Sequence, residues 1–123
     1  MFQYEAYNDP IQRPRYTGLP TFMRAPYRED LEGLEIGLVG VPFDGGVTNR
    51  TGARHGPREI RNQSSLMRRR NQASGIGPHD LCSVADVGDA WVQSPFELEK
   101  SLDEIRSFYA ELHQAGHGPQ SVT

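Results

Sequence analysis

A short apolar run followed by a glycine-rich polar loop and a helix start constrains the fold of this chain more than any other feature. Residues 36–41 carry no charge, which is typical of a strand buried in a parallel sheet. Pro42 ends that strand because proline lacks a backbone donor. Gly56 and Pro57 have the pattern of a helix N-cap and a first helical residue. The sequence therefore predicts a strand, a loop and a helix that runs from about Pro57 to Arg69.

The loop between that strand and that helix carries the candidate functional side chains. Its glycines at positions 45, 46 and 52 permit backbone conformations that other residues resist. Ligands of open α/β sheets gather at the carboxyl ends of the strands, where this loop begins. For His55 two roles stay open, namely a position near a substrate or hydrogen bonds that hold the loop. A role at the substrate mouth or in ordering the loop is predicted for four polar residues, which are Asn49, Arg50, Arg54 and His55.

A second strand, a second helix and the start of a third strand follow along the chain. Residues 81–87 form the second apolar run, and residues 94–97 have the pattern of a capping box with Pro95 at the first helical position. Gly116 is expected to stop this helix, and the third strand to begin near Gln120. This order indicates a parallel three-layer α/β fold. One face of the second helix is apolar, with Leu98, Leu102, Ile105, Tyr109 and Leu112.

The first 30 residues differ from the rest of the chain. They show neither a helical nor an alternating period, so we expect residues 1–30 to form an extended arm and residues 31–123 to form a partial α/β domain. Two interpretations of the apolar residues of the arm stay open, because they could pack on a neighbouring surface or cover the domain's own core. These residues are Phe2, Tyr4, Tyr7, Tyr16, Phe22, Met23 and Tyr27.

Charge and composition argue against several classes of function. The net charge of −3 gives no reason to expect nucleic acid as a partner. No apolar run approaches the roughly 18 residues of a membrane span, and the N-terminus lacks a signal pattern, so we predict a cytoplasmic protein. The basic run of residues 68–70 is interpreted as a solvated helix end or a subunit contact.

Two further groups of residues are candidate chemical sites. Cys82 is predicted to be a small buried strand residue because of its neighbours Leu81 and Val84, and as the single cysteine it cannot form an internal disulfide. Asp86 and Asp89 lack a third ligand nearby, which favours hydrogen bonds to loop amides over a metal site. No Glu-x-x-His pattern occurs among the histidines, and the expected helix stop at Gly116 stands between His113 and His117, so we expect neither a metal site nor a catalytic residue in this chain.

Several motifs together resemble the ureohydrolases, the family that includes arginase, agmatinase and the guanidino-acid amidinohydrolases. Gly-Val-Pro-Phe-Asp stands at residues 40–44, Arg-Thr-Gly-Ala-Arg-His-Gly-Pro at residues 50–57, and Ile-Arg at residues 60–61. The agmatinase-like branch has this combination. Further matching stretches occur at residues 13–16, 18–24 and 84–89, so that the resemblance covers almost the whole chain.

The resemblance implies hydrolysis of a guanidino compound to urea and an amine, with agmatine, guanidinobutyrate or guanidinopropionate as the substrate. It also implies a homo-oligomer and two Mn²⁺ ions that activate a hydroxide. In the family, two His and four Asp of Gly-Gly-Asp-His, Asp-Ala-His-x-Asp and Ser-Phe-Asp-x-Asp-x-x-Asp-Pro motifs hold these ions. This sequence contains none of the three motifs.

The missing motifs lead to two interpretations of the chain. In the first, it is the N-terminal third of a ureohydrolase, truncated at the third strand, whose site another polypeptide completes. In the second, it is a catalytically inactive remnant or an interaction fragment without a metal site. An adjacent reading frame that begins with Gly-Gly-Asp-His would favour the first.

Overall fold

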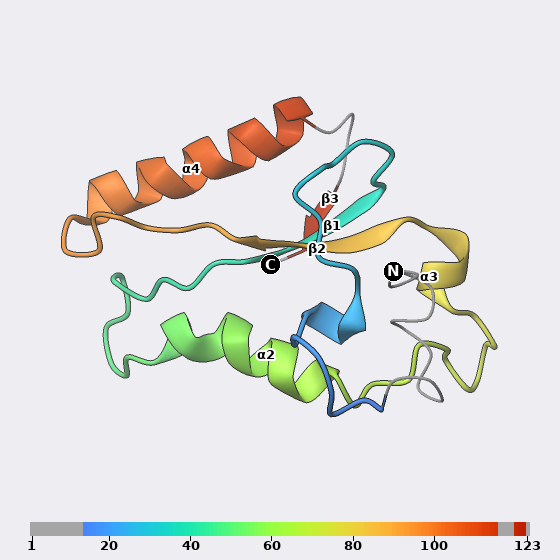
Figure 1. Ribbon diagram of the computed structural model, residues 1–123. Coiled ribbons are helices and arrows are strands. Elements are labelled where there is room, and N and C mark those ends of the chain that lie inside the picture. Colours follow the sequence, from blue (N-terminus) through green and yellow to red (C-terminus); the bar gives the residue numbers. More distant parts are fainter. Residues whose placement is uncertain (1–13, 116–119, 123) are drawn as a thin grey trace.

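The computed structural model describes residues 14–115 and 120–122, and within them a parallel sheet lies between two helices (Figure 1). Strand β1, Ile36–Gly40, lies in the middle of the sheet. Strand β2, Val84–Asp89, pairs with one of its edges, and strand β3, Gln120–Val122, pairs with the other. Helix α2, Gly56–Ser64, covers one face and helix α4, Leu98–Ala115, covers the other. The predicted parallel three-layer α/β arrangement is confirmed.

Three short elements complete the described fold. These are the 3₁₀ turns η1, Phe22–Arg24, and η2, Ala53–His55, and the single-turn helix α3, Pro78–Leu81. The segment after η1 extends the sheet, because Tyr27 forms a parallel bridge with Asp86 of β2. The amide of Asp86 donates to the carbonyl of Pro26 over 2.7 Å. In the described residues the outer edge of β2 is therefore partly covered.

The two faces of the sheet bury different apolar clusters. Leu38 and Val84 pack with Phe22 and Ala25 on the face that α2 covers. The alternate residues of the strands point to the other face, where Ala85 packs with neighbours that include Val87 and Leu112 of α4. This alternation also turns Asp86, which pairs with Leu38 across the sheet, toward α2.

Helix α2 differs at both ends from the prediction. The predicted N-cap, Gly56, is its first helical residue, and the helix ends at Ser64 instead of near Arg69. The hydroxyl of Ser64 donates to the carbonyl of Arg61 and accepts the amide of Met23, 41 residues away. The amide of Met67 then bonds to the carbonyl of Ser64 in a tight turn. These serine contacts draw the backbone out of the helix.

The second strand begins later than the sequence pattern indicated. The predicted range was 81–87, whereas Pro78 starts the short helix α3 and β2 begins at Val84. Leu81 is exposed at the end of α3. Cys82 is half-buried, lies between α3 and β2, and packs against the cluster of Phe22, so the predicted buried strand position was wrong for this residue.

The expected capping box before α4 does not form. Residues 94–97 make a turn in which the Glu97 amide donates to the carbonyl of Ser94, and α4 begins at Leu98. In a capping box the Ser94 amide would donate to the side chain of Glu97. Here it donates to the carboxylate of Glu104. Of the predicted apolar stripe, Leu98 is exposed, and the remaining residues are half-buried in the described structure. The predicted stop at Gly116 lies outside the described residues.

The described part of the N-terminal segment is tied to the domain. Phe22 and Ala25 are buried in the core, which supports the interpretation that these residues cover the chain's own core. Tyr16 and Tyr27 are exposed, and Phe2, Tyr4 and Tyr7 lie outside the described residues. The division into an arm of residues 1–30 and a domain of residues 31–123 stays a prediction.

Candidate functional site

The loop between β1 and α2 is organised around one buried carboxylate, that of Asp44. Its Oδ2 accepts the Gly52 amide over 2.7 Å and the Arg54 amide over 3.3 Å. Its Oδ1 accepts a hydrogen bond from Nε of Arg54 over 2.7 Å. The guanidinium of Arg54 also forms an ion pair with this carboxylate. Gly52 has a φ of 129°, a conformation that favours glycine, and this lets its amide turn back toward Asp44. The carboxylate thus closes the loop on itself.

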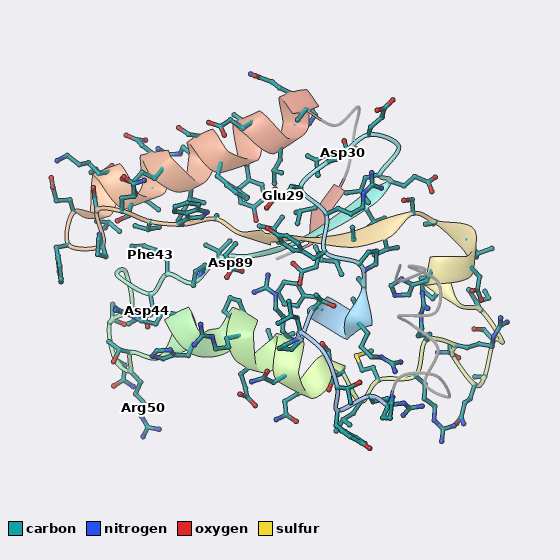
Figure 2. The ribbon with its side chains drawn as sticks, in the orientation of Figure 1. Glu29, Asp30, Phe43, Asp44, Arg50 and Asp89 are labelled. Carbon is teal, nitrogen blue, oxygen red and sulfur yellow. The ribbon has the colours of Figure 1, made fainter. Side chains whose placement is uncertain are left out.

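The four predicted side chains of this loop occupy different places. Arg54 lies against Asp44, whereas Asn49, Arg50 and His55 are exposed. Figure 2 shows Arg50 at the outer end of the loop, directed away from the sheet. His55 takes part through its backbone, whose amide donates to the carbonyl of Gly52 over 3.0 Å. Within residues 14–115 and 120–122 the side chains of Asn49, Arg50 and His55 form no hydrogen bond. Their roles stay predictions.

A second polar cluster fixes this loop end of the sheet to α2. The guanidinium of Arg61 lies between two carboxylates, with Nε 2.8 Å from Oδ2 of Asp86 and an Nη 2.7 Å from Oδ1 of Asp89. A further hydrogen bond of 3.1 Å joins Arg61 to the carbonyl of Gly88. Its guanidinium carbon lies 4.1 Å from the centre of the Phe22 ring. Burial opposes the charge of Arg61, yet the bonds to Asp86 and Asp89 raise its pKa above the usual value.

Of the two aspartates of β2, Asp86 forms the bonds to backbone amides that the sequence favoured. Asp86 is 1% exposed and accepts the amides of Phe22 and Gly88 over 3.0 and 2.9 Å. Asp89 is more open and is the last residue of β2 (Figure 2). Both carboxylates are engaged by Arg61, which connects the end of β2 to α2.

Sequence reasoning missed Asp44 and Arg61 as organising residues. Asp44 belongs to the Gly-Val-Pro-Phe-Asp motif, and an acidic residue among the arginines of a glycine-rich loop is a signal for an internal ion pair. Arg61 carried a weaker signal, because a single arginine on a helix is usually solvated. Its partners lie 25 and 28 residues away and become neighbours only in the folded sheet.

Across residues 14–115 and 120–122, no group of three or more His, Cys, Asp or Glu side chains could hold a metal ion. The described residues therefore do not fit the two Mn²⁺ ions that the resemblance implies. Within the same residues, no helix combines the length and apolarity needed to cross a membrane.

The bonds of Asp44 lead to a testable prediction. The bond from Arg54, followed by that from the Gly52 amide, holds the pKa of Asp44 well below its usual range. A lowered folded-state pKa means that this contribution to stability is complete above the unfolded pKa of about 3.9 and is lost only as pH falls through the lower folded value. The Gly52 amide resonance should therefore keep its position from neutral pH to below about pH 4.

The variant Asp44→Asn should loosen the loop, because an amide gives up the charge-assisted bonds to Arg54. We expect trypsin to cleave after Arg50 or Arg54 on the order of tenfold faster than in the wild type. Glu99→Gln, which neutralises an exposed carboxylate of α4, serves as the control and should leave cleavage unchanged. Equal cleavage rates in the two variants would show that Asp44 does not order the loop.

Comparisons with known proteins agree on one family. The model of the Arginase family matches residues 34–122. Guanidinopropionase of Pseudomonas aeruginosa is 54% identical over 93% of this chain, which spans 36% of that relative. The mitochondrial agmatinase of Gallus gallus is 41% identical over 91% of this chain, which spans 32% of that relative.

A solved structure gives the same result in three dimensions. The proclavaminate amidinohydrolase of Streptomyces clavuligerus superposes with a TM-score of 0.78 at 37% identity, over 84% of this chain and 34% of its own. The chain thus spans about a third of the length of the relatives that it matches.

Proposed function

From the premise that this chain belongs to the arginase family, we propose that it is the N-terminal segment of a hydrolase that releases urea from a guanidino compound. The observation that carries the proposal is the 54% identity to a guanidinopropionase over 93% of the chain. Relatives named agmatinase and guanidinobutyrase match a similar share of the chain at 41% and 39% identity. The proposed substrate class is therefore a linear guanidino compound, with guanidinopropionate, guanidinobutyrate and agmatine as its members.

In this proposal the chain contributes the β1–α2 loop to the active site. The loop lies at the carboxyl end of the sheet, where open α/β folds bind ligands. Arg54 and Asp44 would fix its shape, and the exposed Asn49, Arg50 and His55 would line the substrate mouth. An ordered loop excludes water and orients a bound substrate without taking part in bond breaking. We assign no catalytic residue to the described chain.

The cofactor and the assembly are also proposals. We propose that Mn²⁺ serves the complete enzyme and is held by residues outside the described ones. The described residues contain no suitable cluster of ligands. A metal bound there would supply an activated water. We further propose a homo-oligomer, in which residues 1–30 contribute an arm to the contacts, and a cytoplasmic location.

A chimera tests the proposed activity. This chain would replace the matching third of the Pseudomonas aeruginosa guanidinopropionase, and urea release would be measured with guanidinopropionate, guanidinobutyrate and agmatine. We expect chelator-sensitive urea from the chimera with at least one substrate. The 123-residue chain alone, with excess Mn²⁺, should give no urea above a protein-free control.

Two results would overturn parts of this proposal. A chimera that is folded and carries Mn²⁺ but hydrolyses none of the three substrates would favour the alternative of an inactive remnant. Chelator-sensitive urea from the isolated chain would instead contradict the view that its residues lack the metal site.

A further inference from the structure

A second polar site lies at the opposite end of the sheet from the β1–α2 loop. An open cavity of about 390 Å³ is lined by guanidinium groups from two separate segments, together with Asn71, Gln72 and Gly75. A neighbouring cavity shares Arg68 and Arg69 with it and reaches Ile36 and Val84, the first residues of β1 and β2. The arginines that line the larger cavity are Arg15, Arg24, Arg68, Arg69 and Arg70. We call these five residues the arginine cluster.

Acidic side chains compensate only a small part of the positive charge of the arginine cluster in the described residues. In the described residues its one ion pair joins Arg70 to Asp80 over 2.7 Å, and both side chains are mostly exposed. Arg15 and Arg24 donate to the neutral carbonyls of Leu66 and Met67. Burial, followed by the charges of Arg15 and Arg69, lowers the pKa of Arg24. An anion in the cavity would relieve this repulsion.

Two donors in the cluster lack an acceptor. The Nε atoms of Arg24 and Arg69 are buried and have no hydrogen-bond partner in the described structure. A buried donor without an acceptor costs about 1–3 kcal/mol, and more where the group is charged. Such orphaned groups are uncommon in folded proteins and indicate a missing ion, water or ligand.

The backbone that carries Arg24 is itself in an unfavourable conformation. Met23 and Arg24 have φ angles of 53° and 55°, in the left-handed region that side chains with a Cβ disfavour. The hydroxyl of Ser64 accepts the Met23 amide over 2.8 Å and holds this turn in place. Consecutive strained residues of this kind concentrate at ligand sites, where the surrounding structure stabilises them. Here the strained turn presents Arg24 to the cavity.

We propose that the arginine cluster binds a small phosphate-bearing anion at the end of the sheet opposite the β1–α2 loop. The planar guanidinium fork matches phosphate oxygens in pairs, and the cavity has the size of a small-molecule pocket. The guanidinium group that the proposed hydrolysis attacks is a cation and would be repelled by these side chains. In this proposal the arginine cluster binds an anion that regulates or stabilises the protein. This role goes beyond the proposed hydrolysis.

Calorimetric titration of the 123-residue chain with inorganic pyrophosphate tests this proposal. We expect saturable binding in a buffer whose ionic strength is held constant with NaCl, and an increase in thermal stability. Arg69→Gln and Arg68→Gln should each weaken binding by about tenfold, since each removes one charge-assisted contact. Arg58→Gln removes an exposed arginine of α2 outside the cavity and should bind as the wild type does. Circular dichroism checks that all variants keep the wild-type helix content.

Additional ligands separate the possible sources of the signal. Tighter binding of pyrophosphate than of inorganic phosphate would assign two phosphoryl groups to the cavity, and equal affinity would assign one. The proposal is overturned if neither anion gives a saturable isotherm, or if Arg58→Gln and Arg69→Gln weaken binding equally. Binding of poly-glutamate without binding of either phosphate would also overturn it, in favour of an acidic protein surface as the partner.

Discussion

Replacement of Arg61 by Ala should remove a large part of the stability of the fold. Arg61 neutralises Asp86, which is 1% exposed, and reaches Asp89 at the end of the same strand. Breaking a buried ion pair by removing one partner costs about 3–5 kcal/mol, because the other charge stays buried without compensation. The free energy of unfolding of a typical domain is about 5–15 kcal/mol in total. We expect the urea midpoint of Arg61→Ala to fall by a large fraction of the wild-type value.

Two further variants make this result specific to the buried charge. Arg58→Ala removes an exposed arginine from the same helix and should change the free energy of unfolding by less than about 0.5 kcal/mol. In the double variant Arg61→Ala with Asp86→Asn, the stranded charge is gone and part of the lost stability should return. If Arg61→Ala matches Arg58→Ala, or if Asp86→Asn restores nothing, the buried pair does not stabilise the fold.

The elements set by local signals could be predicted from the sequence. The apolar run before Pro42 gave β1 to within one residue, and Pro57 placed the start of α2 to within one residue. The alternation of strands and helices gave the layer arrangement, because parallel strands need helices to cover both faces. These features depend on neighbours along the chain.

The features that the sequence did not reveal depend on distant contacts. The end of α2 is set by the bond between Ser64 and Met23, and the failed capping box by the bond between Ser94 and Glu104. Local propensity favoured a longer helix and a box, and tertiary hydrogen bonds overrode both.

The organisation of the candidate site followed the same division. The sequence indicated which loop matters, since its glycines and polar residues stand directly after a strand. It did not show that Asp44 closes the loop or that Arg61 joins α2 to the end of β2. Both depend on pairs that only the folded backbone brings within hydrogen-bond distance.

Replacement of Gly40 by Ala should destabilise the chain far more than the same change at Gly37. A Cβ at Gly40 would lie 2.0 Å from Oδ1 of Asp89 and 2.7 Å from Cβ of Pro57, both closer than van der Waals contact allows. To relieve both contacts, Asp89 must leave Arg61 and the first turn of α2 must move away from β1. Overpacking of this kind costs about 1–3 kcal/mol, and the lost contact between Asp89 and Arg61 adds to it.

Gly37 is a matched control because it lies in the same strand. A Cβ there would meet Val87 at 3.6 Å, which is an ordinary contact, so Gly37→Ala should be neutral or should stabilise the chain by up to about 1 kcal/mol. Urea denaturation of both variants measures the difference. A double variant with Asp89→Ala removes one of the two clashes and should recover part of the stability lost in Gly40→Ala. Equal midpoints for the two glycine variants would mean that the close approach of β1, β2 and α2 at Gly40 does not constrain this end of the sheet.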